Sequence, residues 1–208
     1  MSPKAGVAQE GASPNIGCLG VAYTRLTAFH ESSSNLSRCA DNVTMTHRWK
    51  PSVTVAAVIE HQGRYLLIEE HTPEGLRLNN PAGHLDPGEG LVQACAREAL
   101  EETAHGFVPT HLVGIYLARF QRPGADQAQE RDVTYLRFAM GGTLGPFHPE
   151  RALDTGIERV LWLTPDEVRM SAHRHRSPMV LQCVEDHLRG QRYPLELLYT
   201  HPSITGAS

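Results

Sequence analysis

The sequence lacks several features that would place the chain in other classes of protein. No apolar run approaches 18 residues, so no transmembrane helix is expected. The cysteines (Cys18, Cys39, Cys95 and Cys183) form no Cys-x-x-Cys pair, which favours free thiols in a reducing cytoplasm over a disulfide framework or a zinc site. The 19 Lys and Arg residues against 23 Asp and Glu residues give a net charge of -4, without the basic excess typical of nucleic-acid binding.

The first 47 residues also lack hydrophobic periodicity. They are rich in Ser, Ala, Gly and Asn, and their one apolar run, 16–23, is broken by two glycines. This composition predicts a disordered N-terminal extension, and a signal peptide would need a firmer apolar core. Met45 is an alternative start of translation. We therefore expect one domain over 48–200, followed by a loose tail at 201–208.

Strand patterns alternate with two or three helical patterns in this domain. Strands are expected at 52–60, 64–70, 111–121, 133–140 and 157–163, the first two forming a hairpin, and helices are expected from Thr164 and over 177–188. Thr164, Pro165 and Glu167 are the signature of a capping box. The glycines at 141–145 predict a connection after the fourth strand. The pattern indicates an α/β protein, an α/β/α sandwich with a mixed sheet.

Between the second and third strands lies an unusual stretch, residues 83–106. It begins as a loop rich in Gly and Pro and continues as a helix with an apolar face. Glu98, Glu101 and Glu102 fall within an arc of about 100° on this helix, since each residue turns it by about 100°. Three carboxylates on one stripe repel one another, and a divalent cation such as Mg2+, which prefers oxygen ligands, would offset that repulsion.

The same stretch resembles the signature of the Nudix hydrolases. Gly83, Glu89, Arg97, Glu98, Glu101 and Glu102 fill the places of the family pattern at its spacing. Ala104 stands where the pattern has a final Gly, and Gly106 comes two places later. We therefore expect the helix to run about one turn further and to be capped near Gly106.

The resemblance implies a metal-dependent catalytic site. Glu98, Glu101 and Glu102 would be catalytic and, with the backbone carbonyl of Gly83, would bind Mg2+ or Mn2+. Among them, Glu102 is the leading metal ligand and Glu98 the leading base for the attacking water. Glu89 and Arg97 would form an ion pair that fixes the loop against the helix; a phosphate contact is the alternative role for Arg97. A base outside the signature stays open, with Asp154, Glu158, Glu130 and Asp132 as candidates.

Beyond the signature, the chain is similar to the NudJ-like phosphatase branch of the family. The resemblance is carried by 53–56, 81–85, 136–138, 176–178 and 190–196, and it implies thiamine pyrophosphate and hydroxymethylpyrimidine pyrophosphate as substrates. Arg119, Arg122 and Arg137 are candidates for contacts with the pyrophosphate, and Trp49, Tyr116 or Phe120 for stacking on a pyrimidine.

Two other functions stay open. One is hydrolysis of nucleoside di- or triphosphates or of ADP-ribose, and the other is a Nudix domain that senses a ligand without turnover. The expected partner is a small-molecule pyrophosphate, with no nucleic acid and no membrane, and the protein would be a cytoplasmic monomer or homodimer.

Overall fold

The computed structural model describes residues 48–123 and 130–206, which belong to one compact unit, His47–Ser208. The predicted extension 1–47, with Cys18, Cys39 and the alternative start Met45, lies outside the described residues, as does most of the loop around residues 124–129. No helix among the described residues is long and apolar enough to cross a membrane.

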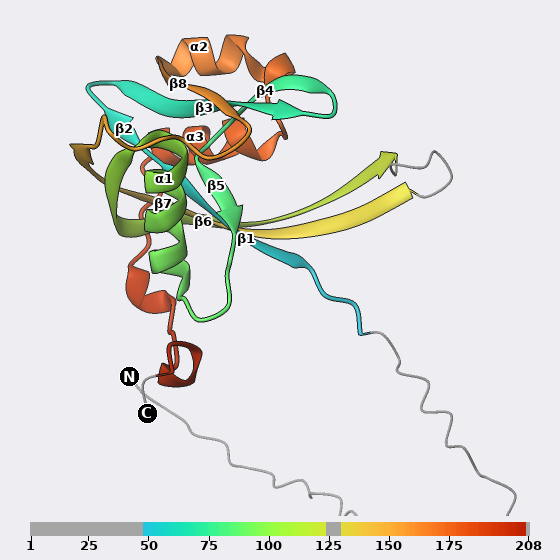
Figure 1. The fold of residues 1–208 in the computed structure, drawn as a ribbon, viewed down its shortest axis with the longest axis vertical. Helices are drawn as coiled ribbons and strands as arrows, with labels where there is room; N and C mark the ends of the chain where they lie inside the picture. The colour runs from blue at the N-terminus through green and yellow to red at the C-terminus, as the bar shows by residue number, and fades with distance from the viewer. Residues whose placement is uncertain (1–47, 124–129, 207–208) are drawn as a thin grey trace, which may run out of the picture. The chain divides into compact units, whose positions relative to one another are not determined.

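Two four-stranded sheets form the centre of this unit (Figure 1). The first has the order β5-β1-β7-β6, in which β1 runs parallel to β7 and the other pairs are antiparallel, so the sheet is mixed. In the second, β3 pairs with β2, β4 and β8, all antiparallel. The strands are β1 Ser52–Val58, β2 Glu60–His61, β3 Arg64–Thr72, β4 Gly75–Asn79, β5 Ala82–His84, β6 His105–Pro123, β7 Glu130–Phe147 and β8 Ile157–Leu163.

Helices cover both sides of the sheets, which confirms the predicted α/β class. The helices are α1 Leu91–Thr103, α2 Pro165–Met170 and α3 Met179–Leu188, with short 3-10 turns η1 Ala172–Arg174, η2 Leu195–Leu197 and η3 Pro202–Ile204. Along β1, Val55 and Ala57 pack in the same cluster as the apolar face of α1, while Ala56 and Val58 pack in the cluster of α2 and α3. Because successive residues of a strand point to opposite faces, β1 supplies both cores at once.

The C-terminus of α1 differs from the prediction. The helix ends at Thr103, and Ala104 adopts the left-handed conformation (φ 56°), donating its N–H to the carbonyl of Leu100 at 3.0 Å. The expected extra turn toward Gly106 was wrong, because an alanine occupies the capping position that glycine usually takes. β6 begins directly afterwards, at His105.

The expected hairpin between the first two strands forms only at its tip, where the two-residue strand β2 pairs with the start of β3. The expected continuous strand 52–60 was wrong, because β1 ends at Val58 and lies in a different sheet from β3. The loop around Gly83, expected to be irregular, contains the three-residue strand β5, which pairs with β1 through Thr54, Val55 and Ala56.

β6 and β7 are much longer than expected and pair along their whole length, with one end projecting from the body as a two-stranded arm (Figure 1). The glycines at 141–145 do not end β7. At Gly142, a Cβ would lie 2.1 Å from the carbonyl oxygen of Val108, in a region where the pairing register shifts. Glycine is therefore needed where bulges bring the two backbones together.

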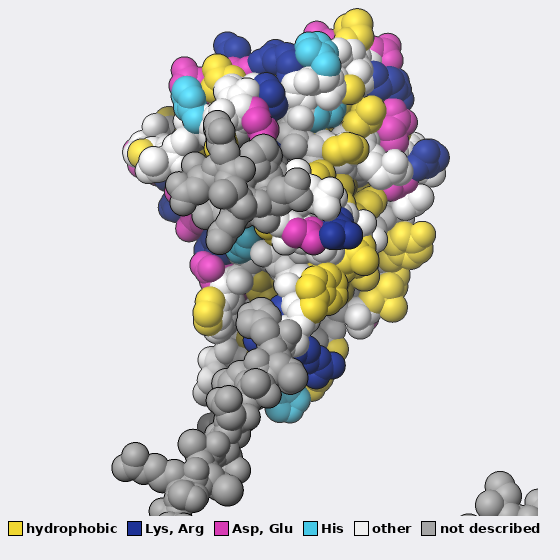
Figure 2. All heavy atoms as spheres, turned by 90° about the vertical axis from the view of Figure 1, so that its right-hand side faces the viewer, with side chains coloured by type: hydrophobic (Ala, Val, Ile, Leu, Met, Phe, Trp, Pro, Cys, Tyr) yellow, Lys and Arg dark blue, Asp and Glu magenta, His cyan; other side chains and the backbone are white. Residues whose placement is uncertain are grey.

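Viewed toward the end of the arm, the surface carries a band of hydrophobic side chains (Figure 2). Ile115 and Leu117 of β6 are among the exposed apolar residues of the protein.

The last third of the domain agrees closely with the sequence pattern. β8 has the predicted bounds, Thr164 caps α2 with the predicted capping box, and α3 ends at Leu188 shortly before Gly190, whose φ is +80°. Tyr193 then pairs with Leu112 of β6, and η2 follows.

Candidate active site

Helix α1 presents its glutamates to the short strand β5. The backbone N–H of Ala82 donates to Glu102 Oε2 at 2.7 Å. A Cβ placed on Gly83 would lie 2.0 Å from Glu98 Oε1, so only glycine leaves room for that carboxylate. Strand β5 and the middle of α1 therefore form one unit, in which the backbone of 82–83 lies against two acidic side chains.

Arg97 holds the acidic group together. Its Nε and Nη2 donate to the two carboxylate oxygens of Glu89 at 3.0 and 2.7 Å, so the predicted ion pair is present. Its Nη1 donates to Glu98 Oε1 and to Glu101 Oε2, both at 2.9 Å, and Nη2 also donates to the carbonyl of His84 at 3.1 Å. One guanidinium thus ties the loop before the helix to two carboxylates of the stripe, and no phosphate is needed to explain its position.

The two innermost carboxylates are buried. Glu98 is 8% exposed and Glu102 is 9% exposed. Burial raises the pKa of Glu98, against the opposing effect of Arg97, and it raises the pKa of Glu102 to about 8. The negative charge of Asp154 also raises the pKa of both residues, and that of Glu70 raises the pKa of Glu102. Ionising both carboxylates therefore requires a compensating positive charge beyond Arg97.

The donor set suits a hard divalent cation, because it consists of carboxylate oxygens that burial leaves short of positive charge. Among residues 48–123 and 130–206, however, no three His, Cys, Asp or Glu side chains are grouped to hold a metal ion. Glu98 and Glu101 each accept a hydrogen bond from Arg97, and Glu102 accepts one from Ala82. The oxygen donors are thus gathered along one stretch of α1, where Arg97 and Ala82 hold them.

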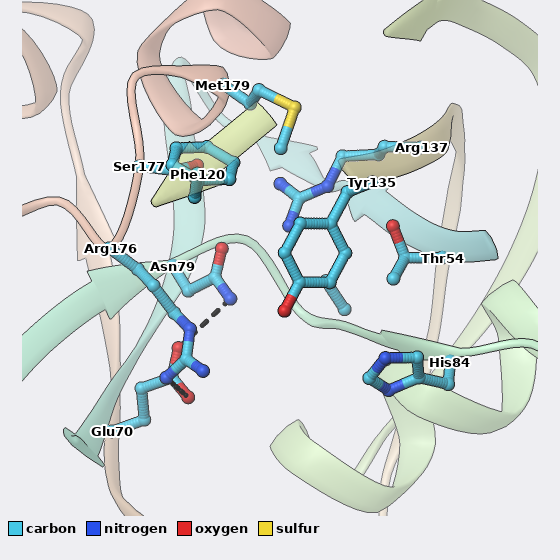
Figure 3. Close-up of a pocket in the computed structure, with 12 residues that line it drawn as sticks. Thr54, Glu70, Asn79, His84, Phe120, Tyr135, Arg137, Arg176, Ser177 and Met179 are labelled. Carbon is cyan, nitrogen blue, oxygen red and sulfur yellow. Dashed lines mark hydrogen bonds and ion pairs between the residues drawn. The ribbon is translucent and has the colours of Figure 1, made fainter. Parts of the chain in front are cut away.

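A pocket of about 180 Å³ opens beside β5 (Figure 3). Gly83 and Ala82 belong to its wall, so the pocket and the carboxylates of α1 share the strand β5. Glu70 also lines the pocket, and its negative charge contributes to the raised pKa of Glu102. The remaining lining residues come from β1, β4, β5, β6, β7, the segment before α3 and the first residue of α3, and are Thr54, Asn79, His84, Phe120, Tyr135, Arg137, Arg176, Ser177 and Met179.

The NUDIX domain family profile matches residues 48–183 of this chain. The chain belongs to the Nudix hydrolase family. It is similar to Phosphatase NudJ of Escherichia coli strain K12, with 35% identity over 150 residues that cover 72% of this chain and 92% of the relative. Together with the family match, this similarity identifies a NudJ-like Nudix phosphohydrolase, an enzyme acting on pyrophosphate substrates.

Solved structures agree with this assignment. A NUDIX hydrolase from Nitrosomonas europaea is 50% identical, with a TM-score of 0.64, and the alignment covers 73% of this chain and 98% of that one. A MutT protein from Bacillus halodurans, at 17% identity and a TM-score of 0.52, covers 68% of this chain and 85% of its own, and it shares the fold.

The three arginines predicted as substrate contacts have different positions in this Nudix domain. Arg137 lines the pocket and is 7% exposed. Arg119 lies outside the pocket lining, paired with Asp132 on the exposed arm through a 2.7 Å hydrogen bond from its Nε. The side chain of Arg122 lies outside the described residues.

The aromatic and acidic candidates also lie in different places, some at the site and some away from it. Phe120 lines the pocket, whereas Tyr116 donates its hydroxyl hydrogen to Asp186 at 2.9 Å, and Trp49 is exposed and absent from the pocket lining. Among the acidic residues considered as bases, Asp154 acts electrostatically on Glu98 and Glu102, while Glu158 is paired with His71 on the surface. Asp132 is occupied by Arg119, and the side chain of Glu130 lies outside the described residues.

Sequence reasoning missed part of the pocket. Glu70, Asn79, Tyr135 and Met179 carried no motif of their own, and Arg176 and Ser177 drew attention only through the resemblance of 176–178 to the NudJ-like branch. That resemblance was the one signal that pointed to this wall of the pocket.

Proposed function

We propose that this enzyme is a Mg2+-dependent phosphohydrolase for thiamine pyrophosphate and hydroxymethylpyrimidine pyrophosphate, releasing phosphate and the monophosphate. The observation that carries the proposal is the position of the pocket, which shares β5 with the carboxylates of α1. A substrate whose ring occupied the pocket would have its diphosphate directed past Gly83 toward Glu98 and Glu102. The similarity to a phosphatase, NudJ, supports the same reaction.

Each residue of the acidic group has a separate role in this proposal. Glu98, Glu101, Glu102 and the carbonyl of Gly83 would hold Mg2+, which when bound neutralises phosphate oxygens and lowers the pKa of water. Glu98 takes the proton of the attacking water, whose oxygen forms the new bond to phosphorus as the bridging P–O bond breaks. Its raised pKa suits a base that must work near neutral pH. Arg97 positions Glu98 and Glu101 through its hydrogen bonds.

The pocket would supply the substrate contacts. Arg137 and Arg176 offer guanidinium groups, and the rings of Phe120 and Tyr135, whose centroids are 5.9 Å apart, offer faces for a pyrimidine. We expect the enzyme to work in the cytoplasm with Mg2+, because carboxylate and carbonyl oxygens suit this cation; Mn2+ would serve the same ligands.

The test is phosphate release from both substrates, with and without Mg2+, beside a panel of nucleoside di- and triphosphates and ADP-ribose. We expect Mg2+-dependent release from the two pyrimidine substrates at rates well above the panel. Faster turnover of nucleotides or ADP-ribose would support the proposed active site but would contradict the proposed substrates. Ligand binding without turnover of any compound would instead support a sensing domain.

A further inference from the structure

The C-terminal segment, residues 193–204, returns to the start of helix α1 after the chain leaves α3 (Figure 1). Tyr193 exchanges two backbone hydrogen bonds with Leu112 of β6, with N···O distances of 2.8 and 2.9 Å. Leu195 and Leu198 then pack against the cluster that contains the apolar face of α1. The segment is therefore attached to the sheet and to the core before it reaches the start of the helix.

The segment meets the loop before α1 at Gly90. Gly90 is buried, although Asp86, Pro87 and Gly88 of the same loop are exposed. A Cβ placed on Gly90 would lie 2.8 Å from Thr200 Oγ1 and 3.3 Å from Thr200 Cγ2. The backbone of Gly90 has φ −89° and ψ 161°, which any residue can adopt. The close approach of Thr200, and not the backbone conformation, therefore favours glycine at this position.

The loop and the C-terminal segment also face each other across a hollow of about 580 Å³. The loop residues 85–91 form one side of it, and the other side consists of Tyr199, Thr200, His201 and Ile204. Leu85 and Leu91, on either side of the exposed part of the loop, pack against the same core cluster as Leu195 and Leu198. The loop is thus fixed at its two ends by apolar contacts, and Thr200 touches it beside the second of them.

Gly90 is connected to the acidic group through its neighbour in the chain. It is the N-cap of α1 and directly follows Glu89. Glu89 accepts hydrogen bonds from Arg97 at 2.7 and 3.0 Å, and Arg97 donates to Glu98 and Glu101, both at 2.9 Å. A shift of Gly90 would therefore displace Glu89 and, through Arg97, two of the carboxylates proposed to hold the metal.

We propose that Thr200 is a positioning residue of the active site, because its side chain limits the movement of the loop at Gly90 and so keeps Glu89 on Arg97. The consequence for metal binding rests on the proposed function, whereas the contact itself does not. Segment 190–196, which resembles the NudJ-like branch, gains a role in this way, since it leads the chain from α3 toward the loop. Altering a residue that orients a metal ligand typically changes metal affinity by about 10- to 100-fold.

Gly90→Ser tests the contact without removing the helix cap, since serine is a good N-cap residue. Its Cβ meets Thr200, so we expect the dissociation constant of Mn2+, measured by calorimetry without substrate, to rise at least about tenfold. Adding Thr200→Ala leaves only a Cβ–Cβ contact at 3.5 Å and should return the constant to within about threefold of the wild type. The control Gly106→Ser, whose Cβ would lie 3.3 Å from Pro146, should bind Mn2+ like the wild type.

Two results of the Mn2+ titrations would overturn the proposal. One is wild-type affinity in Gly90→Ser, and the other is equal weakening in Gly90→Ser and in the double variant. All constants are measured well below the unfolding transition, so a substitution that only lowers the Tm leaves the affinity unchanged.

Amide hydrogen exchange in EDTA separates this proposal from the proposed function. The N–H of Asp86 donates to Glu89 Oε1 at 2.9 Å. It should exchange at least about tenfold faster in Gly90→Ser and at the wild-type rate in the double variant. Unaltered exchange in Gly90→Ser would overturn the positioning role of Thr200. Faster exchange in Gly90→Ser, together with no Mn2+ binding by the wild type, would support the positioning role and overturn the proposed metal site.

Discussion

Replacing Glu102 by glutamine should stabilise the metal-free protein at alkaline pH. Burial raises the pKa of Glu102 to about 8, against an ordinary value of 4.5. Its protonated form therefore favours folding, and this contribution is fully present below about pH 4.5 and lost as the pH rises through about 8. Glutamine resembles the protonated carboxyl at every pH, and its oxygen can still accept the hydrogen bond from Ala82.

The size of the effect follows from the pKa difference. At 1.36 kcal/mol for each pH unit, an unrelieved difference would correspond to about 4 to 5 kcal/mol above pH 8. Rearrangement and water entry around the ionised carboxylate reduce that figure, and we expect about 2 to 3 kcal/mol. For a domain of this size, this corresponds to a rise in Tm of about 5 to 10 °C.

Thermal unfolding followed by circular dichroism in EDTA, at pH 5 and pH 8, measures this effect. The Tm of Glu102→Gln should exceed that of the wild type at pH 8 and should approach it at pH 5. Glu74→Gln, an exposed carboxylate in the β3–β4 turn, provides the control for a general loss of charge and should show neither difference. A Tm difference equal at both pH values, or a variant less stable at pH 8, would refute the reasoning. Added Mg2+ should raise the Tm of the wild type more than that of Glu102→Gln.

Three further predictions test the surroundings of the site. Arg97→Lys loses most of the five hydrogen bonds that the guanidinium makes. It should lower the free energy of unfolding, measured by urea denaturation, by about 2 kcal/mol. An unchanged midpoint of urea denaturation would contradict the role of Arg97 in linking the loop to the helix. Gly83→Ala forces the Glu98 carboxylate aside and should reduce phosphate release at least about tenfold. Gly106→Ala, whose Cβ would lie 3.3 Å from Pro146, should keep its activity, and equal losses in both folded variants would count against a special role for Gly83. Burial lowers the pKa of His187 to about 4, so the free energy of unfolding should fall as the pH drops from about 6.5 toward 4. His187→Gln should reduce that fall by about 1 to 2 kcal/mol, and an identical pH profile in the variant would contradict this role of His187.

Local sequence signals predicted the elements whose stability is local. The capping box at Thr164 and the periodic apolar face of α1 each lie within a few residues, and both elements formed as expected. The end of α1 was missed because Ala104 accepts a left-handed conformation that alanine ordinarily avoids. The chain turns there and enters β6 at once, a tertiary requirement that outweighs the local preference.

Long-range pairing explains the errors in the strands. The glycines of β7 predicted a connection, but they lie within the strand, where bulges bring β6 and β7 close together. This need for glycine depends on the partner strand and cannot be seen in the local sequence. By contrast, the Glu89–Arg97 ion pair joins residues only eight positions apart, and it was predicted correctly. The pocket is different, because Glu70, Asn79, Arg137 and Arg176 come from three strands and a loop that no local pattern brings together.

The most direct test of the account is the initial rate of phosphate release from thiamine pyrophosphate, measured for the wild type, Glu102→Gln and Glu74→Gln over a Mg2+ titration. We predict a Mg2+-dependent rate in the wild type and in Glu74→Gln, and a rate reduced at least about a hundredfold in folded Glu102→Gln at every Mg2+ concentration. A Glu102→Gln enzyme with the wild-type rate and the same Mg2+ dependence would contradict the assignment of the active site to the buried carboxylates of α1.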